Sequence, residues 1–509
     1  MPFYSYFQLS MPIQTFIAAF ISSVLIWYIT SSIRAYLKLR HFPGPILATF
    51  SYLWLFKAVL SGRAYQVHLA TRNRHGGQGA LIRIGPDMLI TDDAAISVRI
   101  NSSRAGYGKP AWYSVMRLDP YVHNMISSPD LAFHDDIKAR TAAGYTGRDV
   151  PAMEADVDCQ IEALKALIRR KYLSSERGVR PFDWGLISQY FTLDTVTRAA
   201  YGEESGCLAA DSDVNDYIKT VEGMGLYFAL CSDVPWMGKI FLAPWILNLF
   251  GPKTTDKVGL GVTMGFAERI VRERFSSDTE SQPDMLNSFI RHGLSPNQCS
   301  SEILAQLVAG SDTTANFLRM ALVLLATTPN VYVKLQREID EGIADGRIST
   351  PISLAEAKML PYLQAFLLES LRFRPPVWML FPRTVPPSGD ILGGQFVPGG
   401  TQICIDSWSL GRRKDVYGED VDVFRPERFT EASPPRRLSM ERHTELFFGS
   451  GRFKCAGQNL AHMEMNKMFV ELLREFDFQV MDPEKMYDLS HRAMFVIRNM
   501  KFRVSQRNR

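Results

Sequence analysis

A glycine-rich stretch that contains one cysteine, Phe448-Gly449-Ser450-Gly451-Arg452-Phe453-Lys454-Cys455-Ala456-Gly457, constrains the fold of this chain more than any other feature. Its glycines allow a tight turn at positions where a Cβ would clash. An apolar pattern at helical spacing follows directly, formed by Met465, Phe469, Leu472, Leu473 and Phe476. We therefore expect Cys455 just before a helix, where the helix dipole, Lys454 and Arg452 lower its pKa. A thiolate in such a loop is a good metal ligand, although a lone cysteine there is more often a buried structural residue.

Length and composition describe an ordinary globular protein with a large core. The chain has 509 residues, of which 46% are hydrophobic and 22% charged. Its net charge of +4 is too small to argue for a nucleic-acid partner. The six cysteines form no CxxC pair or regular framework, which favours a reducing compartment.

The amino terminus reads as an uncleaved membrane anchor. No charged residue precedes Arg34, and residues 13–33 are mostly apolar, with basic residues following them. A cleaved signal peptide has the reverse order of charge, and the positive-inside tendency puts the rest of the chain in the cytosol. We divide the chain into an anchor (1–33), a basic flank with a Pro43-Gly44-Pro45 hinge (34–46) and a single body (47–509). The alternative is a buried helix; with an anchor, the Asn101-Ser102-Ser103 sequon is unused.

Three further segments have a predicted structure. Residues 80–91 alternate as a β-hairpin around Gly85-Pro86-Asp87, and helical periodicity dominates from about 150 to 360. The apolar segment 236–250 is interrupted by proline too often to form a spanning helix. It remains open whether this segment is core, the wall of a substrate channel or a patch that dips into a bilayer.

A long helix is predicted from Ser295-Pro296 to Thr328. Its middle contains Ala309-Gly310-Ser311-Asp312-Thr313-Thr314, most of which are poor helix formers that compete for backbone hydrogen bonds. We expect Thr313 to bond back to the Ala309 carbonyl and to leave a groove beside Gly310. The alternative is a helix that is merely irregular.

Two charged motifs follow this helix. Glu369 and Arg372 are spaced i, i+3, so that they share one helix face and can pair. Alone, such a pair is usually a solvated surface contact. Downstream comes Phe424-Arg425-Pro426-Glu427-Arg428-Phe429, which supplies a second arginine.

The order and spacing of these motifs resemble the cytochrome P450 family over nearly the whole chain after the anchor. The loop with Phe448, Gly451, Cys455 and Gly457 resembles that family's haem-thiolate signature, and residues 309–314 match its oxygen-activation motif. The resemblance implies a mainly α fold with small β-sheets (α+β) and haem b as cofactor. It makes Cys455 the axial iron ligand.

The resemblance also implies roles for other residues. Asp312 and Thr313 would deliver protons, while Glu369, Arg372 and Arg428 would form a buried structural triad. The residues expected to hold the cofactor are His134, Lys138, Arg383, Phe448, Arg452, Ala309 and Gly310. The residues expected to face substrate are Ala305, Trp378, Met379 and Leu380. Two positions depart from the family pattern. Phe453 stands where the family usually has Arg or His, and Lys138 stands where it usually has Arg.

The cysteine loop and the following helix look most like fungal pisatin-demethylase-type members. That subgroup suggests oxidation of a small hydrophobic secondary metabolite such as a terpenoid, polyketide or alkaloid. No flavin or nicotinamide motif occurs, so an NADPH-dependent reductase would supply electrons at the endoplasmic reticulum membrane. Its basic docking face is expected at Arg412-Arg413-Lys414, Arg436-Arg437 and Arg442. The alternatives are a haem-thiolate isomerase or dehydratase that needs no reductase, and a non-catalytic membrane haem sensor or carrier.

Overall fold

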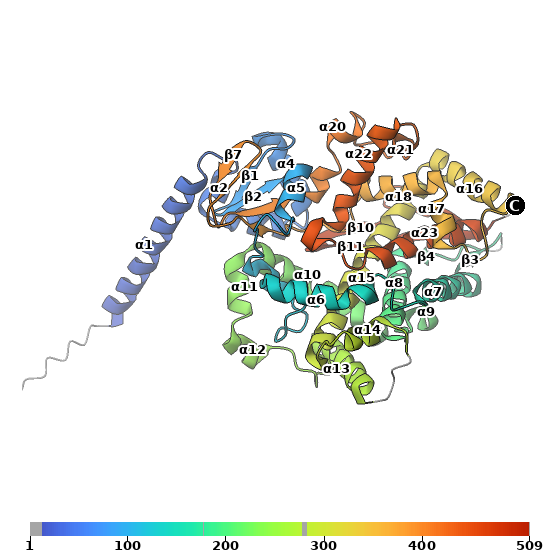
Figure 1. Ribbon diagram of the computed structural model, residues 1–509, viewed down its shortest axis with the longest axis horizontal. Helices are drawn as coiled ribbons and strands as arrows, with labels where there is room; N and C mark the ends of the chain where they lie inside the picture. The colour runs from blue at the N-terminus through green and yellow to red at the C-terminus, as the bar shows by residue number, and fades with distance from the viewer. Residues whose placement is uncertain (1–12, 177, 277–281, 508–509) are drawn as a thin grey trace, which may run out of the picture.

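Helices form most of the molecule, and several small sheets are distributed among them (Figure 1). The computed structural model describes residues 13–176, 178–276 and 282–507. The expected mainly α fold with small sheets is confirmed. Residues 1–12 of the predicted anchor lie outside the described residues.

The helices before the long central one are α1 Ile13–Leu39, α2 Ile46–Phe50, α3 Leu53–Leu60, α4 Ala64–His75, α5 Ala94–Ile100, η1 Ala111–Met116, α6 Leu131–Tyr145, α7 Met153–Leu167, η2 Ile168–Tyr172, α8 Trp184–Tyr201, α9 Cys207–Ala210, η3 Val214–Asp216, α10 Tyr217–Asp233, α11 Pro235–Phe241, α12 Pro244–Phe250, α13 Leu260–Ser276 and α14 Met285–Arg291. The helices from the central one onward are α15 Pro296–Ala326, α16 Pro329–Ala344, α17 Leu354–Lys358, α18 Pro361–Phe373, α19 Ser407–Leu410, α20 Lys414–Tyr417, α21 Glu427–Thr430, α22 Pro434–Glu445, η4 Leu446–Phe448, η5 Gly451–Phe453 and α23 Gln458–Glu475.

The strands are β1 Ile82–Gly85, β2 Met88–Thr91, β3 Leu173–Ser174, β4 Phe182–Asp183, β5 Arg383–Thr384, β6 Asp390–Leu392, β7 Gln395–Val397, β8 Gln402–Ile405, β9 Phe476–Val480, β10 Asp488–Arg492, β11 Met494–Arg498 and β12 Lys501–Gln506. The predicted hairpin is confirmed as β1–β2, an antiparallel pair in which Ile82 faces Ile90. It extends into a four-stranded sheet in the order β1-β2-β8-β5, so that Arg383 on β5 is held at a sheet edge. The pairs β10–β11 and β6–β7 form separate hairpins.

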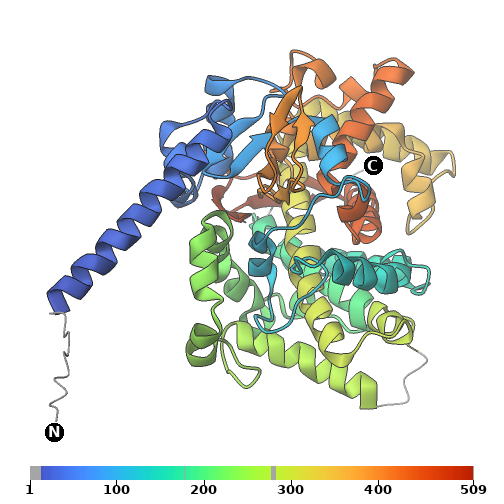
Figure 2. The same cartoon turned by 60° about the vertical axis from the view of Figure 1, so that its left-hand side comes forward.

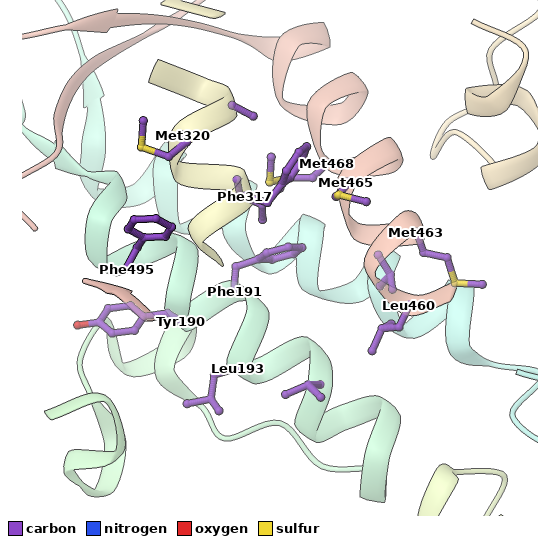
Figure 3. Close-up of a cluster of buried hydrophobic side chains, with 14 of the residues drawn as sticks. Tyr190, Phe191, Leu193, Phe317, Met320, Leu460, Met463, Met465, Met468 and Phe495 are labelled. Carbon is purple, nitrogen blue, oxygen red and sulfur yellow. The ribbon is translucent and has the colours of Figure 1, made fainter. Parts of the chain in front are cut away.

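The central helix α15 organises the core. It starts with the predicted proline at its first position and a capping box between Ser295 and Gln298, which satisfies free N–H groups there. Figure 3 shows apolar side chains of α8, α15 and α23 converging in one cluster. The cluster contains Tyr190, Phe191, Leu193, Phe317, Met320, Leu460, Met463, Met465, Met468 and Phe495. Because α15 is buried along most of its length, any accessible turn in it is informative.

Helix α1 projects from the body at one side (Figure 2). Its segment Thr15–Leu39 has a mean hydropathy of 1.9, and by length and composition it can cross a membrane. The helix runs past the predicted end at Ile33, and its last residue, Leu39, is fully buried in the body. The buried Arg83 donates to the Ala35 and Thr49 carbonyls, so the base of the helix is tied to β1. The predicted Pro43-Gly44-Pro45 hinge lies against that strand, where a Cβ on Gly44 would come within 2.3 Å of the Arg83 carbonyl oxygen.

The apolar segment 236–250 forms two short helices, α11 and α12, each with a proline at its first turn. Their large side chains are exposed, namely Trp236, Ile240, Phe241, Trp245, Leu249 and Phe250. The core interpretation is therefore wrong for these residues. In both views α11 and α12 lie on the side of the body from which α1 projects (Figures 1 and 2).

All six cysteines lie within the described residues, and none is paired with another. Four of them, at positions 207, 231, 299 and 404, are buried among apolar side chains.

Candidate functional site

The cysteine loop is a tight turn that ends at the first residues of α23. The Cys455 backbone N–H donates to the Phe448 carbonyl at 2.7 Å, which closes the loop. Gly451 has a φ of +56°, and a Cβ there would lie 2.4 Å from the Asn101 carbonyl oxygen. The same carbonyl accepts from the Arg452 backbone N–H at 2.9 Å. The glycine therefore lets the loop pack directly on the end of α5.

The Cys455 thiol is accessible, yet protein surrounds it. Burial raises its pKa and outweighs the backbone N–H groups of Gly457 and Gln458 and the charges of Lys138 and Lys454, which act to lower it. The predicted lowering of this pKa is therefore wrong, because desolvation is the larger effect. A bound metal cation would supply the positive charge that favours the thiolate.

A cluster of buried cations lies near the loop. Arg383 donates through Nε to the Asn101 side-chain oxygen at 2.9 Å and through Nη1 to the Tyr113 hydroxyl. Its guanidinium also lies 3.7 Å from the centre of the Phe453 ring. Phe453 thus occupies the expected charged position as a flat surface on which Arg383 stacks.

Lys109 is a second cation in this cluster, and the sequence did not single it out. Its amine donates to the Met125 and Ile126 carbonyls and lies 4.6 Å from the Tyr113 ring centre. Burial and the charge of Arg383 lower the pKa of Lys109 to about 7.

Within the described residues, neither Arg383 nor Lys109 has a carboxylate within salt-bridge distance. The buried carboxyl of Glu302 acts on Lys109 only from beyond that distance, and buried cations without a directly paired counter-charge are costly. The pair therefore fits an anionic ligand such as the propionates of a haem.

Three of the residues expected to hold the cofactor instead support the cysteine loop. Lys138 donates to the carbonyls of Arg452 at 2.6 Å and Lys454 at 3.1 Å. Arg452 lies 3.4 Å from the Asp135 carboxylate, and His134 bonds to that residue as well. Lys138 therefore holds the backbone of the loop, Arg452 Nε has no hydrogen-bond partner among the described residues, and the expected propionate role of these two residues stays a prediction. His134 packs its ring 5.1 Å from the Phe453 ring and so braces the loop from α6.

One turn of α15 is accessible although the helix around it is buried. Ala309 is exposed, and Val308, Gly310 and Thr313 are half-buried. As expected, the Thr313 hydroxyl donates to the Ala309 carbonyl at 2.8 Å. Gly310 allows close packing of α15 on α8, where the sequence had predicted a groove. A Cβ at this position would lie 2.7 Å from the Val196 side chain of α8. Ala309 and Thr313 therefore form the open surface of this helix.

Asp312 is buried beside that turn. One of its oxygens, Oδ1, accepts from the Gln189 amide at 2.5 Å, whereas Oδ2 has no hydrogen-bond partner. Burial raises the pKa of Asp312 to about 7, against the opposing charge of Arg319. An acid with a pKa near neutrality suits proton transfer. Phe448 of the cysteine loop is half-buried against the ring of His462, and it belongs to the same central core.

The expected substrate-facing residues divide into two groups. Trp378 is 1% exposed, and its indole N–H donates to Asp406 at 2.9 Å between the rings of His68 and His491. Leu380 is fully buried in the core. These two expectations are wrong, because both side chains are used in packing.

Met379 and Ala305 remain candidates for contact with substrate. Met379 is half-buried and packs beside Val59 and Ala229, and Ala305 is nearly buried on α15. Phe381 is 40% exposed and lies 5.6 Å from the Trp112 ring. Phe381 directly follows Leu380 in the chain, and its exposure adds it to the candidates.

The structure brings the three charged residues of the expected triad together. Arg372 donates through Nε and Nη2 to the two Glu369 oxygens at 2.7 Å each, and Arg428 Nε lies 3.0 Å from both. The Arg425 backbone N–H adds a further bond to Glu369 at 2.9 Å. This cluster is buried and fully hydrogen-bonded, as a structural element should be.

Asn101 and Glu464 are two further residues that the sequence gave no reason to select. Asn101 was read only as an unused sequon, but it is buried and joins the cysteine loop to Arg383. Glu464 on α23 is a buried carboxyl with an unpartnered Oε1, and burial raises its pKa well above the usual range. Neither could be found from local pattern, because the contacts come from distant segments.

Comparison with known proteins agrees with this geometry. Residues 89–505 match the family described as Cytochrome P450. Cytochrome P450 monooxygenase ABA1 of Pyricularia oryzae is 45% identical over 462 residues, which cover 90% of each chain. Cytochrome P450 monooxygenase aba1 of Botryotinia fuckeliana is 42% identical over 473 residues and 92% of each chain. Cytochrome P450 monooxygenase abl1 of Leptosphaeria maculans is 40% identical and covers 91% of this chain and 82% of its own.

Proposed function

The chain belongs to the cytochrome P450 family, and we propose that it is a monooxygenase that inserts one oxygen atom from O2 into a hydrophobic small molecule. The observation that carries this proposal is the position of Asp312 and Thr313. The two residues are neighbours in the chain at the accessible turn in the middle of α15. An isomerase, a dehydratase or a haem sensor has no need of a neutral-pKa acid with an unpartnered oxygen at that place.

The residues present fit a haem b group. Cys455 would bind its iron, and Arg383 and Lys109 would pair with its propionates. Thiolate-bound haem iron supplies the activation of dioxygen and cleavage of its O–O bond. Asn101, Tyr113 and Phe453 would orient the Arg383 guanidinium for that contact.

The roles of Asp312 and Thr313 follow from their hydrogen bonds. Thr313 keeps its hydroxyl at the open face of α15 by donating to the Ala309 carbonyl. Asp312 can hold a proton on Oδ2 near neutral pH and pass it toward that face. The bonded oxygen Oδ1 fixes the carboxyl while the free oxygen exchanges the proton.

Electrons would come from NADPH through a separate flavoprotein reductase. Of the expected docking residues, Arg412 is excluded because it is buried against the Trp408 ring, and Arg413 pairs with Asp415. Arg436 and Arg442 on α22 are exposed and support a docking face there. If charge reversal at both leaves reductase-supported turnover and its salt dependence unchanged, this assignment fails.

The location we propose is the endoplasmic reticulum membrane, with a single span and the body in the cytosol. The apolar helix α1 and the exposed aromatic residues of α11 and α12 lie on one side of the molecule, which supports their contact with one lipid surface (Figures 1 and 2). Replacing Trp245 and Phe250 by serine should weaken vesicle binding of the chain lacking residues 1–33. Unchanged binding would contradict a contact of α12 with lipid.

We propose a fungal secondary metabolite, such as a terpenoid, polyketide or alkaloid, as the substrate class. The relatives that carry a monooxygenase name come from fungi, and the candidate contact residues Met379, Ala305 and Phe381 are apolar.

The test is a screen of such compounds with the purified chain, reductase, NADPH and isotopically labelled O2. One labelled oxygen atom in a product whose formation requires NADPH supports the proposal. Turnover without NADPH and without label would contradict it and favour an isomerase or dehydratase.

A further inference from the structure

A small internal cavity lies beside Asp312, away from the cysteine loop. Its volume of about 20 Å³ is enough for one water molecule. The polar residues that line it are Gln189 of α8, Glu222 of α10, Asp312 and Arg319 of α15, and Arg492 of β10. The cavity therefore joins the buried acid to a second carboxyl on another helix.

Hydrogen bonds decide which Asp312 oxygen is free. Gln189 donates its amide N–H to Oδ1 of Asp312, while its own oxygen accepts from Arg319 Nη2 at 2.7 Å. The arginine fixes the amide orientation because it can only donate. Arg319 is itself held by Asn316 and Ser188. Asp312 is thus locked through Oδ1, and Oδ2 is left as the oxygen that can take a proton.

Glu222 connects the same cavity to the surface. Its Oε2 accepts from Arg498, whose side chain is 60% exposed, while the Glu222 side chain is 14% exposed. The negative charge of Glu222 helps to raise the pKa of Asp312. The charges of both carboxyls act on the same buried arginine, Arg319, so the two groups are electrostatically connected across the cavity.

We propose that Glu222 relays protons from solvent to Oδ2 of Asp312 through one water molecule held in this cavity. The proton on Glu222 passes to the water, the water gives one of its own to Asp312, and solvent protonates Glu222 again. This inference rests on the proposed monooxygenase function, because it supplies the acid that the reaction consumes.

The test measures proton exchange at Asp312 in the haem-loaded protein, and it needs no substrate. The infrared C=O band of protonated Asp312 is the band lost in Asp312→Asn, and its shift in D2O reports exchange. In Glu222→Gln we expect this exchange to slow by about tenfold or more, because an amide cannot relay a proton. The matched control Glu268→Gln changes an exposed carboxylate paired within α13 and should exchange like the wild type.

A second variant separates proton relay from structural support. Arg498→Gln breaks the ion pair but keeps the Glu222 carboxyl, so its exchange rate should stay close to wild type. Equal slowing in Arg498→Gln and Glu222→Gln, or no slowing in Glu222→Gln, would overturn the relay. The reduced carbon monoxide spectrum of the same samples reports haem-thiolate binding separately, so a failure of the proposed function is distinguishable.

Discussion

Two buried carboxylates in this protein have opposite surroundings. Glu369 receives bonds from both Arg372 and Arg428 and from a backbone N–H, and both of its oxygens are used. Asp312 also lies near an arginine, but Gln189 stands between them and one oxygen has no partner. Both oxygens of Glu369 are therefore hydrogen-bonded, whereas Asp312 has one oxygen without a hydrogen-bond partner in the described chain.

This difference in hydrogen bonding indicates that Glu369 stabilises the fold and that Asp312 takes part in the reaction. The fully paired carboxylate of Glu369 holds α18 to α21 and to the segment before it, because it accepts from Arg428 and from the Arg425 backbone N–H. A half-paired carboxyl with a pKa raised to about 7 can gain or lose a proton while its position stays fixed. Incomplete pairing at Asp312 is therefore a sign of function.

Removing the Glu369 charge should have the largest effect on the molecule. Glu369→Gln leaves two buried arginines without their partner, and we expect a loss of ~3–5 kcal/mol in the free energy of unfolding. Denaturant unfolding measures this loss, and poor recovery of folded protein is its extreme form. The control Glu431→Gln alters an exposed pair with Arg425 and should stay within about 0.5 kcal/mol of wild type. A similar small change in Glu369→Gln would remove the basis of the comparison.

Asp312→Asn should lower activity and leave the fold stable, in contrast to Glu369→Gln. The asparagine oxygen still accepts from Gln189 and carries no charge to bury, so we expect the variant to be at least as stable as wild type at neutral pH. Product formation should fall by about 10²-fold or more, because the amide cannot donate a proton. Parallel measurements of thermal unfolding and of product per NADPH consumed test both parts. Unfolding comparable to that of Glu369→Gln would mean that Asp312 is structural.

Lys109 extends the comparison to cations. It is buried with no carboxylate within salt-bridge distance in the described chain, but its amine donates to two carbonyls, so Lys109→Met should lower the stability of the haem-free protein by no more than about 2 kcal/mol. The rate of haem loss to an acceptor protein should rise roughly tenfold, as one charge-assisted bond of ~1.5 kcal/mol is lost. Lys414→Met, at an exposed site paired with Glu419, serves as the control. Unchanged haem loss in Lys109→Met would show that Lys109 does not contact the cofactor.

The pH dependence of stability tests the raised pKa of Asp312 directly. The pKa of Asp312 is raised from 3.8 to about 7 in the fold, so between these values the folded state holds a proton that the unfolded state has released. The Asp312 contribution therefore makes the protein less stable as pH rises from about 4 to about 7, and it levels off above that range. Unfolding of Asp312→Asn across this range should show a flatter profile than wild type, with Arg319 and Glu222 unchanged. An identical slope in both proteins would contradict the raised pKa.

The sequence predicted those features that depend on local residue pattern and on the spacing of motifs. The long helix with its capped start, the β1–β2 hairpin and the Thr313–Ala309 bond all follow from residues close together in the chain. Motif order then indicated the family and the loop around Cys455. These features need no knowledge of distant contacts.

The errors came from residues whose role is fixed by distant segments. Trp378 was expected to face substrate, but Asp406 and two histidine rings hold it in the core. Leu380 was likewise expected to face substrate, but it is fully buried in the core. Conversely, Lys109 and Gln189 can be identified as candidate site residues only when their burial and their hydrogen-bond partners are known.

The most direct measurement is the absorption spectrum of the reduced protein with carbon monoxide, for wild type, Cys455→Ser and the control Cys159→Ser. Cys159 is exposed and lies on α7, away from the loop. We predict a strongly red-shifted Soret band in wild type and Cys159→Ser and its loss in Cys455→Ser, because only Cys455 provides the thiolate. A band typical of histidine-bound haem in wild type, or a red-shifted band that persists in Cys455→Ser, would contradict the assignment of the site.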